Sequence, residues 1–196
     1  MSRFLYLAAF AYLGLCAYAV NARAGAPPPD AAHAQAGIEP GDATGGGWLT
    51  RVRPMCNPVE VDVGMRRMPP PEGFEGRAYQ AACYALAGRI DQARGAIASL
   101  PPEQRAAAAD ILLAIADPVA DAGDDRAAGP MMRLVLEFSP DSYIALYHAG
   151  ISEYALGERD AARQHLTRFL QLYSAEDGFR RRAEEVLGEM GVAGGA

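Results

Sequence analysis

Small and apolar residues recur through the second half of the chain at intervals of 35 and 34 residues. Gly88, Gly123 and Gly157 form the first such column, and internal repeats of this length are typical of helical repeat proteins. The same intervals relate three further columns: Ala81, Ala116 and Gly150; Ala93, Ala128 and Ala162; Ile97, Met132 and Leu166. A glycine at the turn can end a helix, and small residues allow two helices to cross closely. The pattern predicts three helical hairpins, at residues 74–107, 109–142 and 143–176.

These columns resemble the consensus of the tetratricopeptide repeat (TPR) family, over about half of the chain. Pro140 matches the proline that ends a repeat in that family, and Ser139–Asp141 is typical of a helix that stops and restarts. Residues 177–190 form one more amphipathic segment, the expected capping helix of an open array, before a disordered tail at 191–196. The resemblance implies an all-α fold, a short α-solenoid of about three hairpins closed by that capping helix.

Some residues depart from the family pattern. Arg77 and Gln80 stand where the first hairpin of the family usually has large apolar residues. In the second hairpin, Pro118 lies inside the first helix, and Gly129–Pro130 interrupts the second. We therefore expect the middle hairpin to be kinked.

Residues 48–73 precede the repeats and predict two short elements that stop at a run of three prolines. Asn57 and Pro58 are typical of a helix cap followed by a first turn. Against this, the valines from Val59 to Val63 alternate with acidic residues, which is the period of a strand. We favour helix, because the repeats offer no strand with which this segment could pair.

The first 24 residues have the pattern of an export signal. An apolar run from Phe4 to Val20 follows a positive start, and small residues precede a cleavage point before Gly25. The run is slightly shorter than the roughly 20 residues of a membrane helix, so a retained anchor with membrane contact through residues 4–20 is the alternative. Residues 25–47 are dominated by Gly, Ala and Pro and predict a flexible tether. The sequence thus predicts an exported protein, periplasmic or otherwise extracytoplasmic, anchored in the inner membrane if the apolar helix is retained.

Cleavage of the signal would leave two cysteines, Cys56 and Cys83. An even pair in an oxidising compartment usually forms a disulfide. The competing interpretation is a pair of buried free thiols. A metal site is less favoured, because neither cysteine has a second ligand at C-x-x-C or C-x-x-H spacing.

Charge and motifs narrow the classes of function. All 18 basic residues are arginine and the formal net charge is −6, so no basic field exists to attract nucleic acid. No phosphate loop or nucleophile motif is present, and the histidines His33, His148 and His165 lie in separate segments. Asp124–Asp125 is interpreted as a helix cap. We expect no catalytic activity, no metal and no cofactor.

The TPR resemblance implies a groove lined by the first helix of each hairpin. Its positions fall on Glu75, Ala78, Ala82 and Ala85 in the first hairpin; on Asp110, Leu113, Asp117 and Asp121 in the second; and on Ile144, Tyr147, Ile151 and Tyr154 in the third. Such a groove is acidic in the middle and aromatic at one end, and predicts a basic, partly apolar protein or peptide partner. In the alternative interpretation, the aspartates form a solvated face and the tyrosines pack against the capping helix.

The resemblance and the export signal together predict a non-enzymatic interaction adaptor or scaffold outside the cytoplasm. The alternative function is an accessory or structural subunit, anchored by its N-terminal apolar helix in a larger membrane protein complex. Since TPR repeats name an architecture more than an activity, the sequence leaves the partner open.

Overall fold

The computed structural model describes residues 44–193, and no strand occurs among them. The expected all-α class is confirmed. The export signal and the tether up to residue 43 lie outside the described residues, as does the end of the tail, residues 194–196. In chain order the helices are α3 (Gly45–Val52), α4 (Val61–Arg67), α5 (Phe74–Leu86), α6 (Ile90–Ala98), α7 (Pro102–Asp121), α8 (Asp125–Phe138), α9 (Tyr143–Leu156), α10 (Arg159–Leu172) and α11 (Gly178–Ala193), with a 3-10 turn, η1 (Arg53–Met55), after α3.

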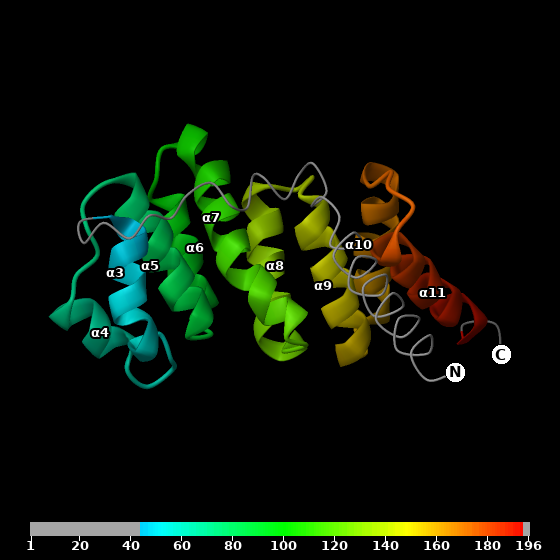
Figure 1. Cartoon of the computed structure of the whole chain (residues 1–196), viewed down its shortest axis with the longest axis horizontal. Helices are drawn as coiled ribbons and strands as arrows, with labels where there is room; N and C mark the ends of the chain where they lie inside the picture. The colour runs from blue at the N-terminus through cyan, green and yellow to red at the C-terminus, as the bar shows by residue number, and fades with distance from the viewer. Residues whose placement is uncertain (1–43, 194–196) are drawn as a thin grey trace, which may run out of the picture. The chain divides into compact units, whose positions relative to one another are not determined.

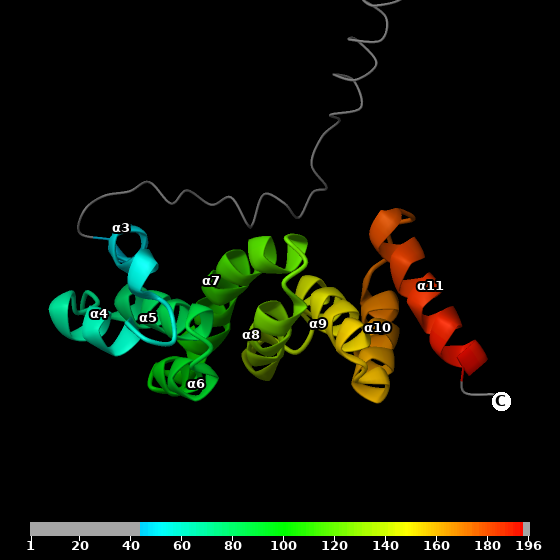
Figure 2. The ribbon, with the colours of Figure 1, turned by 90° about the horizontal axis from the view of Figure 1, so that it is seen from below.

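Helix α3 packs against α5, α7 packs against α5 and α8, and α9 packs against α8 and α10. Helices α5 to α11 follow one another across Figure 1, with α3 and α4 at the α5 end. Helices α5 and α6, α7 and α8, and α9 and α10 form the three pairs joined by the glycine turns. In Figure 2, α3 lies at one end over α5, and α11 lies at the other end next to α10, with α7 and α9 between them.

The three turns within the pairs have the same local structure. Gly88, Gly123 and Gly157 adopt φ angles of 69°, 75° and 84°, a region that side-chain-bearing residues rarely enter. In each turn the residue after the glycine donates its N–H to the carbonyl five residues earlier, as in the bond from Glu158 to Glu153 at 2.8 Å. This bond closes the end of a helix in the Schellman manner. The predicted role of the three glycines is confirmed.

The other three columns lie in the core. Their nine residues are all buried: Ala81, Ala116, Gly150, Ala93, Ala128, Ala162, Ile97, Met132 and Leu166. The crossing of α9 and α10 shows why the first of these columns is small. A Cβ added to Gly150 would lie 2.6 Å from Cγ of Leu166, far inside van der Waals contact.

The segment before the repeats is helical, as we favoured, but its first helix begins earlier than expected. Helix α3 begins at Gly45, inside the predicted tether, and Thr44 caps it by accepting a hydrogen bond from the Gly47 N–H at 3.2 Å. The absence of a side chain at Gly45 brings α3 against α5, because a Cβ there would lie 2.4 Å from the Tyr79 ring. Composition predicts flexibility here, whereas tertiary packing selects helix.

Helix α4 replaces the strand that the alternating valines allowed. The Asn57 side chain accepts hydrogen bonds from the N–H groups of Val59 and Glu60 at 3.1 and 3.0 Å, which starts the turn that leads into α4. Asn57 thus caps the turn that precedes α4 and not the helix itself, whose N-cap residue is Glu60, three residues later than predicted. Trp48 fixes the other end of the segment by donating its indole N–H to the Met68 carbonyl at 2.8 Å.

The expected interruption at Gly129–Pro130 is wrong. Helix α8 runs through both residues, and α7 runs through Pro118. Pro130 lies in the second turn of α8, where the carbonyl that loses its donor belongs to Arg126, an exposed residue. Water can satisfy that carbonyl, so the missing hydrogen bond does not end the helix. The C-terminal helix α11 likewise continues to Ala193, past the predicted start of the tail.

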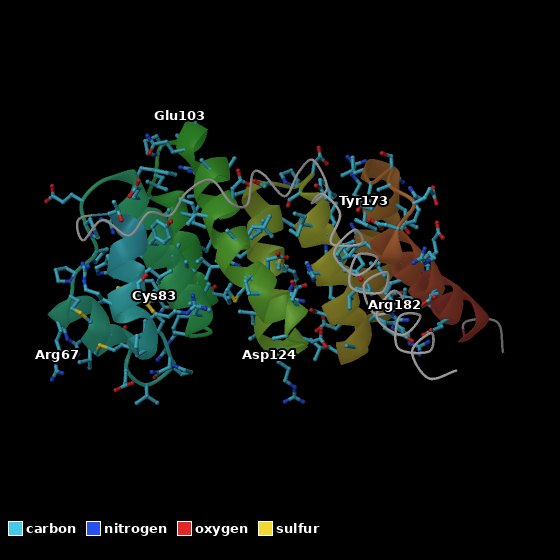
Figure 3. All side chains as sticks on the ribbon, in the orientation of Figure 1. Arg67, Cys83, Glu103, Asp124, Tyr173 and Arg182 are labelled. Atoms are coloured by element: carbon cyan, nitrogen blue, oxygen red, sulfur yellow. A yellow bond between two sulfur atoms is a disulfide. The ribbon has the colours of Figure 1, made fainter. Side chains whose placement is uncertain are left out.

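The predicted disulfide between Cys56 and Cys83 is present, and the Cα atoms of the two residues are 5.0 Å apart. Figure 3 shows it as the yellow bond beside the Cys83 label. Cys83 is fully buried on α5, and Cys56 directly follows η1. The bond therefore joins the segment that precedes the repeats to the first helix pair.

Candidate functional site

The N-terminal third of the groove implied by the TPR resemblance is covered by α3. Ala78, Ala82 and Ala85 are buried, and the Glu75 carboxylate accepts a hydrogen bond from the Gly45 N–H at 3.0 Å. Glu75 thus holds α3 in place, and the three buried alanines offer no surface to a partner.

The C-terminal third lies against α11. The Tyr147 ring meets the Phe179 ring edge-on, with 5.1 Å between centroids, and the Tyr154 hydroxyl donates a hydrogen bond to Glu189. Ile151 and both tyrosines are partly buried against the core between α9, α10 and α11. Burial raises the pKa of Tyr147, and the hydrogen bond to Glu189 raises that of Tyr154. The tyrosines thus pack against the capping helix, as in the alternative interpretation of the sequence.

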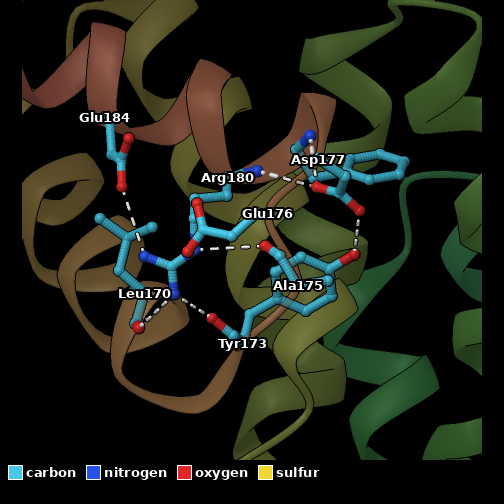
Figure 4. Close-up of polar contacts among 8 residues, drawn as sticks. Leu170, Tyr173, Ala175, Glu176, Asp177, Arg180 and Glu184 are labelled. Atoms are coloured by element: carbon cyan, nitrogen blue, oxygen red, sulfur yellow. Dashed lines mark hydrogen bonds and ion pairs between the residues drawn. The ribbon is translucent and has the colours of Figure 1, made fainter.

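A polar cluster at the start of α11 holds this helix in position (Figure 4). The Arg180 guanidinium donates to the carbonyls of Ala175, Leu170 and Tyr173, which lie at the end of α10 and in the connection to α11. Asp177 accepts hydrogen bonds from the Phe179 and Arg180 N–H groups at 3.0 and 3.2 Å and so caps α11. Because these contacts fix α11, the fold itself covers this end of the groove that the resemblance implies.

The same cluster sets the titration of Asp177. Partial desolvation of this carboxyl acts to raise its pKa. The hydrogen bond from Tyr173, the two backbone N–H groups and the nearby charge of Arg181 act in the opposite direction and prevail, so the pKa of Asp177 is lowered. Asp177 is therefore ionised in the folded protein at neutral pH.

Between the two covered ends lie five of the predicted groove positions, which we call the central face. They are Asp110, Leu113, Asp117 and Asp121 of α7 and Ile144 of α9. Asp110 and Ile144 line an open hollow of about 440 Å³ whose floor is completed by the connection from Phe138 to Ser142. The aspartates repeat at i, i+7 and i+11, which places them along one side of α7. The central face is therefore an acidic strip with apolar residues beside it.

Asp110 has no compensating partner on this strip. Within residues 44–193 it forms no hydrogen bond or ion pair, and desolvation raises its pKa. Asp110 is an exposed residue, so solvent screening keeps the free-energy cost of this unpaired carboxylate small.

Asp117 and Asp121 face a histidine of the next helix pair. The His148 Nε2 atom lies 3.0 Å from Oδ1 of Asp117 and 3.8 Å from Oδ1 of Asp121. The His148 ring is buried and stands edge-on to Tyr147, with 5.1 Å between ring centroids. The three side chains bring three potential metal ligands within 4.8 Å of one another.

No motif in the sequence points to this cluster. His148 follows Asp117 by 31 residues, and no ligand motif relates the two positions. Their meeting depends on the packing of α7 against α9, which is a tertiary contact. His165, the other histidine of the repeats, has a different role: its Nδ1 lies 2.7 Å from the buried carboxylate of Glu153, which also faces Arg133. His165 and Arg133 thus compensate the buried charge of Glu153, and this cluster presents no open surface to a ligand.

Comparison of the chain with protein-family models, with curated proteins and with solved structures finds no match in any of the three. In the part of the chain that the structure describes, no helix has both the length and the apolar character needed to cross a membrane. The geometry of the central face is thus the basis for a functional proposal.

Proposed function

We propose that the protein is a non-enzymatic adaptor outside the cytoplasm that binds a basic, partly apolar segment of a protein partner on the central face. In this proposal α5 to α10 are three TPR-like hairpins of a short solenoid, and α11 is its capping helix. The observation that carries the proposal is the strip of three aspartates on α7, none of which pairs with an arginine among the described residues.

The apolar residues of the same face support a mixed partner. Leu113 and Ile144 are half-buried beside the aspartates, and the hollow next to Asp110 has room for one apolar side chain of a bound segment. An extended or helical segment with alternating arginine or lysine and apolar residues matches both features. Charge complementarity would chiefly set the association rate and the choice of partner.

The repeated local structure supports the solenoid. Each of the three turns has a glycine in the left-handed region, and all nine residues of the three core columns are buried. Open helical arrays of this type bind partners along the face lined by the first helix of each hairpin. Because α3 and α11 cover the two ends, we place the binding segment over α7 and the start of α9.

The proposal is tested by photocrosslinking in the native envelope. A photoreactive amino acid at Leu113 should crosslink to a partner, and the crosslinked peptide should contain lysine or arginine. The same amino acid at Arg126, an exposed position of α8 outside the central face, should not. Equal crosslinking from both positions, or a crosslinked segment without basic residues, would contradict the proposal.

Charge variants then measure the contribution of the strip. The double variant Asp110→Asn/Asp121→Asn keeps the contact of Asp117 with His148. We expect it to lower the affinity for the crosslinked segment about tenfold at low salt, as for the loss of two exposed ion pairs of about 0.7 kcal/mol each. The matched control is Asp62→Asn/Asp160→Asn, which removes the same charge from exposed positions of α4 and α10. A similar loss in the control would show that only the net charge of the protein matters.

A further inference from the structure

The cluster of Asp117, Asp121 and His148 combines two oxygen ligands and one nitrogen ligand from two helices. Asp117 and Asp121 are one turn apart on α7, and His148 reaches them from α9. The His148 side chain is only 10% exposed, and its Nε2 atom is directed at both carboxylates, at 3.0 and 3.8 Å. Packing therefore fixes the histidine ligand, whereas Asp117 is half-buried and Asp121 is exposed.

The electrostatics of this position favour a cation. Asp121 is the last residue of α7 and Asp117 lies one turn earlier, so both are near the negative end of the helix dipole, and like charges one turn apart repel each other. Within the described residues neither carboxylate pairs with an arginine, although the chain is rich in arginine. Arg182, which lies near Tyr147, pairs instead with Glu185 and Glu189 of its own helix.

The distances suit a small divalent ion. Zinc binds nitrogen and carboxylate oxygen at about 2.0–2.2 Å, so two ligands of a tetrahedral site lie about 3.4 Å apart. The separations of 3.0 and 3.8 Å bracket that value. Calcium and magnesium prefer shells made wholly of oxygen, whereas an imidazole ligand selects zinc and its first-row neighbours. Asp121 is largely exposed, so at least one coordination position is open to water or to a partner.

We propose that Asp117, Asp121 and His148 form a binding site for a divalent cation of the zinc class. The proposal stands on ligand geometry alone and does not need a protein partner. It has one consequence for the central face, since a bound dication neutralises the two carboxylates that would meet a basic segment. By linkage, the metal and a basic partner would then weaken each other's binding.

The test is a calorimetric titration of the purified, chelator-treated chain with zinc chloride. We expect one site per chain, with calcium and magnesium at least tenfold weaker. Asp121→Asn and Asp117→Asn should each lower the zinc association constant at least tenfold. The matched control Glu103→Gln removes the same charge from the opposite end of α7 (Figure 3) and should change the constant less than twofold.

His148→Gln should abolish zinc binding, and circular dichroism shows whether this buried substitution still folds. Asp121 is exposed, so Asp121→Asn keeps the test decisive if the His148 variant does not fold. An absence of zinc binding by the wild-type chain would overturn the proposal. So would an equal loss in Glu103→Gln, or binding that is lost in His165→Gln and retained in Asp121→Asn.

Discussion

At the residue scale, Asp110 and Asp177 show how the same side chain serves opposite purposes in this fold. Asp177 receives hydrogen bonds from Tyr173 and from the start of α11, so ionisation is favoured and its pKa is lowered. Asp110 is partly desolvated without a partner, so ionisation is disfavoured and its pKa is raised. The first carboxylate stabilises the fold. The second contributes no stabilising contact to the fold.

We predict that Asp110→Asn stabilises the protein while it weakens the binding of a basic partner. A carboxyl whose pKa is raised on folding destabilises the folded state at any pH above that pKa. The amide removes this cost, and because solvent screens the exposed Asp110 we expect only a small gain, below about 0.5 kcal/mol at pH 7. The gain should shrink as the pH falls toward the pKa of Asp110, because the wild-type side chain then becomes neutral as well.

Urea unfolding of the wild type and of Asp110→Asn at several pH values measures this difference. Asp160→Asn, at an exposed position of α10, is the control for a general effect of net charge. A variant that is less stable than the wild type at pH 7 would show that Asp110 serves the fold, and the argument for a binding role would then fail.

At the element scale, the disulfide decides whether α3 belongs to the folded unit. The bond joins Cys56, next to η1, to Cys83 in the last turn of α5. Helix α3 also packs on α5 at Gly45, whose N–H donates to the Glu75 carboxylate. An eight-residue helix is far too short to be stable alone, so its structure depends on this contact and on the crosslink.

We predict that Cys56→Ala/Cys83→Ala lowers the free energy of unfolding by about 3.5 kcal/mol, the chain-entropy value for a loop of this length. Without the crosslink this segment opens first, so the rate of hydrogen exchange should rise first at the backbone amides of α3. Reducing agent should reproduce the effect in the wild type and leave the double variant unchanged. An unchanged stability, or uniform loss of protection over all helices, would contradict the prediction.

The helix pairs could be predicted from the sequence, because their determinants are local or strictly repeated. A glycine in the left-handed region and a small residue at a crossing leave a fixed spacing in the chain, as at Gly88 and Gly150. The start of α3 could not be predicted. A glycine-rich segment such as the one around Gly45 is predicted to be flexible from its composition. Only the contact with Tyr79 in the folded structure requires a residue without a side chain at position 45.

The candidate site was predictable only in part for the same reason. The strip of aspartates follows from the spacing along α7, whereas the meeting of Asp117 with His148 depends on how two helix pairs pack. The sequence allows the packing of Tyr147 against α11 as an alternative, and in the structure Phe179 provides this contact.

At the scale of the whole molecule, the helices at its two ends limit the face that we propose for binding. Helix α3 covers the face at α5 and α11 covers it at α9, so the face of α7 is left between them. The net negative charge of the chain adds to the attraction that the three aspartates of this face would exert on a positively charged partner. A basic partner would therefore be attracted over a distance and held at one place, with an association rate that falls as salt is added.

The N-terminal segment decides whether the protein is free or tethered to a membrane. A disulfide between the two cysteines that follow Gly25 is compatible with an oxidising compartment. The positive start, the apolar run and the small residues at Ala22 and Ala24 match a cleaved signal. We expect intact-mass spectrometry of the native protein to find a chain that begins at Gly25. Replacing Ala22 and Ala24 by leucine should block cleavage and retain residues 1–24, since the cleavage site requires small side chains. A native chain that keeps residues 4–20 and is extracted only by detergent would favour the membrane-anchored accessory subunit over the free adaptor.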